Sequence, residues 1–234
     1  GGAPRLSVSL PPLVEKLRVS YQLVTAGKFQ EALDSFSSIA CALSLAVVST
    51  RPQVNELKEL LSICRDYILA LKIELQRKRT PATDLARQME LAAYFTHCKL
   101  QPSHSILALR SAMNAAFKAK LFKSAASFGR RLLELNPKPE ISTSARKVVQ
   151  HGDANPTEAF EYRYDERNPF VVCAISFVPI YRGSPLLKCT YCKANYLPEH
   201  QGAPCILGIG EVGGTAPGLD EAYCLDRGSA EAQD

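Results

Sequence analysis

Apolar residues recur at helical spacing through the first two thirds of the chain, and this periodicity constrains the fold more than any other feature. Between Val54 and Arg79, leucines and isoleucines return every three or four residues, which is the spacing of one face of an α-helix. The same pattern predicts further helices over residues 9–26, 29–42, 85–97, 103–118, 120–136 and 139–151. We therefore expect a mainly α-helical fold.

The composition changes near Gly152 to Pro156. Before this point the chain is rich in Leu, Ala, Lys, Arg and Glu, and after it Pro, Gly, Tyr and Val become more frequent. With 234 residues the chain is long enough for two domains. We expect a helical domain over residues 1–160, built as an irregular helical-repeat-like bundle, and a small β- and loop-rich module over residues 165–234.

Two segments of the helical part have the residues of a tetratricopeptide-type helical hairpin. In such a hairpin a glycine makes the turn, an aromatic ring fills the groove, and a small residue lets the helices approach. The first segment carries Tyr21, Gly27, Phe29, Ala32 and Phe36, and the second carries Phe122, Ala125, Leu132 and Pro137. Ordinary αα-hairpins in an irregular bundle explain both segments equally well.

The charge pattern argues against two classes of partner. The net charge of +5 is mild and spread along the chain, whereas a nucleic-acid surface needs clustered basic residues. There is also no run of 18 or more apolar residues. We therefore expect neither nucleic-acid binding nor direct insertion into a membrane.

The cysteines of the last third suggest a metal site. Cys189 and Cys192 have the C-x-x-C spacing of a knuckle, a turn that points two thiolates at one tetrahedral metal. Cys205 follows, but Gly208 stands where a second pair would place its thiol. Candidates for a fourth ligand are Cys173, His200 and Cys224. We expect a relic knuckle with no bound metal and no cofactor, and zinc at Cys189, Cys192 and Cys205 is the alternative.

No set of residues assembles a catalytic site. His97 and Cys98 are adjacent, so their side chains on a helix point about 100° apart rather than forming a thiol–imidazole pair. The basic groups at residues 77–79 and 130–131 are interpreted as solvated helix faces. We expect no enzyme activity. The alternatives are a zinc-dependent enzyme or a zinc-ribbon-containing binding module.

The module should begin with a strand. The apolar run from Phe170 to Phe177 predicts a strand with Phe170 as its anchor and Pro179 as its end. Both faces are largely apolar, so we expect one to be covered by the module itself and the other by a helix or by a partner. The segment 181–185 then predicts a turn into a second strand near Leu186.

Four segments resemble the C-terminal region of the coatomer alpha subunit, part of the COPI vesicle coat. They read LAAYFTHCKLQP (91–102), FGRRLLEL (128–135), NPFVVCA (168–174) and PIYRG (179–183). The resemblance runs from about Ser9 to Cys205. It implies a largely helical scaffold with a β-hairpin that is enclosed by the coatomer epsilon subunit. It also implies contact with other coatomer subunits.

The resemblance further implies where such a chain acts. The expected places are the cytoplasm, the periphery of Golgi membranes and COPI-coated vesicles, in Golgi-to-ER and intra-Golgi protein transport. The chain begins without Met, which suggests a fragment of a longer protein whose cargo-recognising β-propellers lie elsewhere. After Cys205 the sequence departs from the family pattern, with a glycine-rich stretch over residues 210–218.

Overall fold

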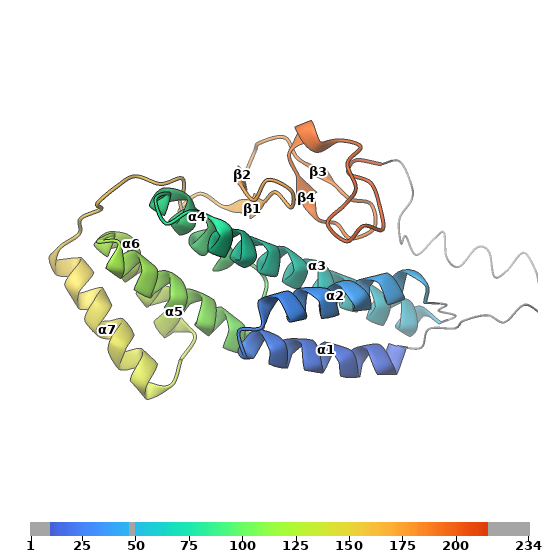
Figure 1. The fold of residues 1–234 in the computed structure, drawn as a ribbon, viewed down its shortest axis with the longest axis horizontal. Coiled ribbons are helices and arrows are strands. Elements are labelled where there is room, and N and C mark those ends of the chain that lie inside the picture. Colours follow the sequence, from blue (N-terminus) through green and yellow to red (C-terminus); the bar gives the residue numbers. More distant parts are fainter. Residues whose placement is uncertain (1–9, 47–49, 215–234) are drawn as a thin grey trace, which may run out of the picture. The chain divides into compact units, whose positions relative to one another are not determined.

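The computed structural model describes residues 10–46 and 50–214. Within them the chain forms seven α-helices, followed by four short strands and one 3-10 helix (Figure 1). The helices are α1 (Leu10–Thr25), α2 (Phe29–Ser44), α3 (Arg51–Arg79), α4 (Leu85–Phe95), α5 (Pro102–Lys118), α6 (Phe122–Glu134) and α7 (Pro139–Ala154). The other elements are β1 (Phe170–Val172), β2 (Pro179–Tyr181), β3 (Leu187–Lys188), β4 (Asn195–Tyr196) and η1 (Pro198–His200).

The predicted class, mainly α with a small C-terminal β-rich module, is confirmed. Each helix that the periodicity predicts is present, with ends displaced by a few residues. The largest displacement at a helix start is at α3, which begins at Arg51 rather than Val54. The start of α6 moves to Phe122 because Lys120 takes a left-handed conformation, with φ of 58°.

The chain groups into two compact units, each built from separate segments of the sequence. One unit contains residues 1–23, 30–69 and 169–234, and the other contains residues 24–29 and 70–168. One boundary between the units falls inside α3, between residues 69 and 70, and another falls between residues 168 and 169. Residues after 168 therefore group with the first helices, and the prediction of a separate module over 165–234 stays a prediction.

The core of the first unit forms around stacked aromatic rings from α1, α2 and α3. Phe36 is fully buried and stacks on Tyr67 with ring centroids 4.7 Å apart. Tyr21 lies 5.9 Å from Phe36 and 5.1 Å from Tyr67. The Ser20 and Ser35 hydroxyls also share a hydrogen bond of 2.8 Å between α1 and α2. These contacts make α1 and α2 the first of the predicted helical hairpins.

The second unit has an apolar core that includes Leu109, Phe128 and Leu132, all almost fully buried. Two helical glycines allow α6 and α7 to pack closely. A Cβ built on Gly152 would lie 2.4 Å from the Phe122 carbonyl oxygen, and one built on Gly129 would lie 2.8 Å from Val149. Only a residue without Cβ fits at such distances.

The segment after α7 returns to this core. The Phe122 amide donates to the Thr157 carbonyl over 2.9 Å. The Glu158 carboxylate accepts from the amide and the hydroxyl of Ser124 in the first turn of α6, at 2.7 and 2.9 Å. A carboxylate in this position accepts from an N–H group that has no partner within the helix, and its negative charge interacts favourably with the positive end of the helix dipole.

The β module differs from the predicted strand. The strand β1 ends at Val172 because the chain turns over residues 174–176, and Phe177 takes a left-handed φ of 52°. Pro179 therefore begins β2 instead of ending a long strand. β2 pairs antiparallel with β1, with Phe170 opposite Tyr181. The predicted turn after Tyr181 is present, and β3 pairs with β4 in a second small sheet.

Across the described ranges, none of the helices is long and apolar enough to cross a membrane.

Candidate functional site

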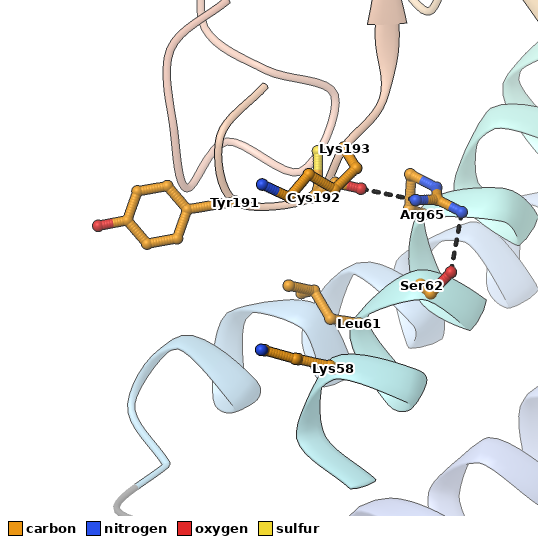
Figure 2. Close-up of a pocket in the computed structure, with 7 residues that line it drawn as sticks. All are labelled: Lys58, Leu61, Ser62, Arg65, Tyr191, Cys192 and Lys193. Atoms are coloured by element: carbon orange, nitrogen blue, oxygen red, sulfur yellow. Dashed lines mark hydrogen bonds between the residues drawn. The ribbon is translucent and has the colours of Figure 1, made fainter. Parts of the chain in front are cut away.

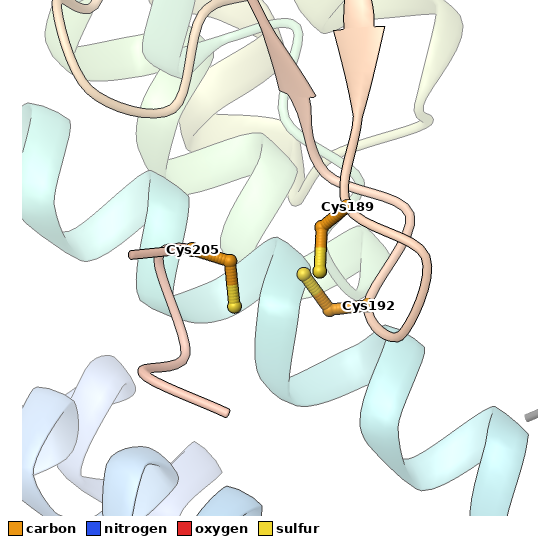
Figure 3. Close-up of side chains that lie close together, drawn as sticks. All are labelled: Cys189, Cys192 and Cys205. Carbon is orange, nitrogen blue, oxygen red and sulfur yellow. The ribbon is translucent and has the colours of Figure 1, made fainter. Parts of the chain in front are cut away.

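Three cysteine side chains converge inside the β module. The sulfur atoms of Cys189, Cys192 and Cys205 all lie within 4.8 Å of one another, and all three residues are buried. Figure 3 shows the Cys189 and Cys192 side chains directed at each other from one turn, with Cys205 arriving from a separate segment. The three metal candidates of the sequence therefore form a real cluster.

Two turns of the backbone produce this convergence. In the first, the Lys193 amide donates to the Cys189 carbonyl over 3.0 Å, with Lys193 at a left-handed φ of 59°. In the second, the Gly208 amide donates to the Cys205 carbonyl over 2.8 Å, with Gly208 at φ of 70°. In the first turn the left-handed residue is Lys193, four positions after Cys189. In the second turn it is Gly208, only three positions after Cys205. Gly208 therefore makes the second turn, at the position that Cys192 takes in the first.

Hydrogen bonds give the sulfur atoms unequal proton affinities. A hydrogen bond between the two side chains raises the pKa of Cys192 and lowers the pKa of Cys205. The backbone N–H groups of Leu207 and Ile209 also lower the pKa of Cys205, because they donate to its sulfur. The Ala194 N–H acts in the same direction on the pKa of Cys192. Of Cys192 and Cys205, Cys205 is therefore the thiol with the lower pKa.

The proposed fourth ligands do not join the cluster. Cys173 is fully buried and His200 lies in η1, and neither belongs to the group of three sulfur atoms. Cys224 lies outside the described residues. The expectation that no metal binds is not tested by this geometry.

A basic hollow of about 330 Å³ adjoins the first cysteine turn (Figure 2). It is lined by Lys58, Leu61, Ser62 and Arg65 of α3 and by residues 191–193. The Arg65 guanidinium donates to the Cys192 carbonyl and to the Ser62 hydroxyl, each over 2.8 Å, and pairs with Asp66. Arg65 thus ties the cysteine turn to α3.

The β1–β2 hairpin presents apolar side chains to solvent. Val171 on β1 is 37% exposed and Ile175 in the turn is 38% exposed. Phe170 is half-buried and packs edge-on against Tyr181 at 5.7 Å. Val171 therefore lies on an open face of the hairpin in the isolated chain. No helix covers it within the described residues, and the expected cover by a partner stays a prediction.

His97 and Cys98 serve separate structural contacts. The Tyr164 hydroxyl lies 2.8 Å from His97 Nε2, and Cys98 Sγ contacts the Tyr94 carbonyl at 3.6 Å. Arg131 donates to the Thr96 carbonyl at the C-terminal end of α4 and also faces His97. The interpretation of Arg131 as a solvated helix residue is wrong, since its guanidinium closes the end of a neighbouring helix.

Sequence reasoning missed two residues of the cysteine site. Arg65 gave no signal, because its partner carbonyl lies 127 positions away. Gly210 was read only as part of a glycine-rich stretch, yet a Cβ at this residue would lie 2.9 Å from the Cys189 sulfur. No local signal could have found this contact, because Gly210 lies 21 positions after Cys189.

The fold and the site together define a helical protein with a small cysteine-rich β module. A family model that describes the C-terminus of the coatomer (COPI) alpha subunit matches residues 1–224. The chain therefore belongs to this family of coatomer alpha C-terminal regions.

Individual relatives of the chain are named as alpha subunits of coatomer. The chain is 50% identical to "Coatomer subunit alpha" of Dictyostelium discoideum and 46% identical to "Coatomer subunit alpha-1" of Arabidopsis thaliana. These matches cover 93% and 92% of this chain. "Coatomer subunit alpha" of Saccharomyces cerevisiae is 30% identical over 88% of the chain. The chain spans 18% of the length of the first two relatives.

Proposed function

We propose that this chain is a structural, non-enzymatic part of a COPI coat that binds the coatomer epsilon subunit. Membership of the coatomer alpha family is the observation that carries the proposal. Such a chain acts in the cytoplasm, at the periphery of Golgi membranes and on COPI-coated vesicles. It contributes there to Golgi-to-ER and intra-Golgi protein transport, together with other coatomer subunits.

The β1–β2 hairpin supports the choice of the epsilon subunit. The family resemblance implies a β-hairpin that is enclosed by the helical repeats of that partner. The exposed apolar side chains of Val171 and Ile175 offer area that a partner would remove from water. Stable interfaces bury about 1,600 Å² in total, so helices must contribute beside the hairpin.

The histidines of the helical part support a structural role. His97 is held by Tyr164 and Arg131, and His104 Nε2 lies 2.9 Å from the Thr25 hydroxyl. Each of these imidazoles contributes to packing between segments of the chain. We propose neither a reaction nor nucleic-acid binding for them.

Co-elution tests the proposal. The purified chain and a purified epsilon subunit are mixed at micromolar concentration and separated by size-exclusion chromatography. We expect one earlier peak that contains both proteins in equal amounts. Separate elution of the two folded proteins would contradict the proposal.

A further inference from the structure

We propose that Cys189, Cys192 and Cys205 bind one zinc ion as thiolates and that this ion holds the β module together. The proposal is independent of which protein the chain binds in a coat. The three residues are between 0% and 4% exposed, so the ion would be buried and its role structural. Three thiolates leave one of the four tetrahedral positions of zinc to a ligand outside this cluster.

The separation of the sulfur atoms fits a single ion. Zinc–sulfur bonds of about 2.3 Å place the sulfur atoms of a tetrahedral site about 3.8 Å apart. The observed separations are at most 4.8 Å, so the sulfur atoms need approach by no more than about 1 Å. Side-chain rotation about Cα–Cβ bonds provides such a movement without a change of backbone.

The backbone around the cluster is already arranged for thiolates. The N–H groups of Leu207 and Ile209 donate to the Cys205 sulfur, and the N–H group of Ala194 donates to the Cys192 sulfur. Each of these donors stabilises a negatively charged thiolate, whereas a neutral thiol is a weak acceptor and gains little from them. Binding would release the protons of the thiols to solvent, because zinc takes the deprotonated sulfur.

The position of Gly210 indicates that the cluster needs close packing around sulfur. Its Cα stands so near that an added Cβ would lie 2.9 Å from Cys189 Sγ and 3.0 Å from the Tyr191 ring. The Cys205 amide also donates to the Gly210 carbonyl over 2.8 Å, which joins the second turn to this glycine. The backbone thus covers one side of the three sulfur atoms.

The site also connects segments that would otherwise be joined weakly. Cys189 and Cys192 belong to the turn between β3 and β4, whereas Cys205 follows η1. Between them the chain has only short pairings, such as the single bridge of Cys189 with Val212. An ion shared by both segments would fix them, and with them the Cys192 carbonyl that accepts from Arg65.

Metal analysis of the purified 234-residue chain tests the proposal. The chain is prepared in reducing buffer with zinc, freed of loose ions by gel filtration, and analysed by elemental mass spectrometry. We expect about one zinc per chain. After replacement by cobalt, we expect thiolate-to-cobalt absorption bands in the near ultraviolet. Zinc well below a tenth of an equivalent, or a Cys189–Cys192 disulfide under the same reducing conditions, would overturn the proposal.

Matched variants assign the ligands. In Cys189→Ser and Cys205→Ser the zinc content should fall at least tenfold, with loss of the cobalt bands. Cys173→Ser removes an equally buried thiol that lies outside the cluster, and it should keep the metal. Circular dichroism of the helical signal shows that each variant is folded. Full zinc retention in Cys205→Ser would also contradict the proposed site.

Discussion

His97 is a single residue whose surroundings make the stability of the chain depend on pH. Partial removal of the ring from water, together with the charge of Arg131, lowers the pKa of His97 from 6.5 to about 4. Between these two pKa values the folded chain therefore binds fewer protons than the unfolded chain. Because of His97, the unfolding free energy is highest above about pH 6.5 and falls as the pH drops towards 4. His97 is partly exposed, so solvent screening limits the effect to about 1 kcal/mol.

The variant His97→Gln isolates this effect. Its loss of unfolding free energy between pH 7 and pH 4.5 should be smaller than that of the wild type by about 1 kcal/mol. Urea melts at both pH values measure the difference, and the carboxylates that titrate in the same range cancel between the two proteins. Identical pH dependence in both would contradict the role given to His97.

At the same scale, Arg65 should be the residue that most affects the attachment of the cysteine turn to α3. Its side chain is 15% exposed, and Arg65→Met would leave the Cys192 carbonyl without this donor and Asp66 without its partner. We expect a loss of about 2–3 kcal/mol in unfolding free energy. Arg79→Met changes the same residue type at an exposed position of α3 and should cost under about 0.5 kcal/mol. Equal losses from the two substitutions would show that the Arg65 contact is dispensable.

At the scale of helices and strands, the close packing of α6 and α7 can be tested at Gly152. An alanine inside a helix normally stabilises it by up to about 1 kcal/mol relative to glycine. Here its Cβ would lie 2.4 Å from the Phe122 carbonyl oxygen, and the helices must separate. We expect Gly152→Ala to lower the unfolding free energy by about 1–3 kcal/mol. Gln150→Ala, at an exposed position of the same helix, should have almost no effect. A stabilised Gly152→Ala protein would contradict the packing.

The sequence predicted an element well where the contacts that form it are local, and poorly where they join distant residues. The helices were predicted within a few residues because the apolar spacing in α3 or α5 is a local property. The strand from Phe170 was predicted too long, since nothing local showed that the chain reverses at residues 174–176 and pairs back through Pro179. Cys205 meets the first cysteine pair because of the path that the chain takes between Cys192 and Cys205. The number of residues between the cysteines does not determine that path.

At the scale of the whole molecule, the two compact units share the helix α3. The aromatic core of Phe36 and Tyr67 belongs to one unit, and the core around Phe128 belongs to the other. Each unit combines segments that lie far apart in the sequence, and composition alone does not show which segments group together.

We propose that the intact chain binds the coatomer epsilon subunit with its β1–β2 hairpin. Calorimetric titration of the two purified proteins measures this binding. For the wild type we expect a 1:1 complex of submicromolar Kd. The variants Val171→Asp and Ile175→Asp should weaken binding at least tenfold, because each places a charge in an apolar contact. Leu107→Asp, at a similarly exposed apolar residue of α5, should leave the Kd within about threefold. Absence of binding in the wild type, or unchanged binding in both hairpin variants, would show that the hairpin does not bind the epsilon subunit.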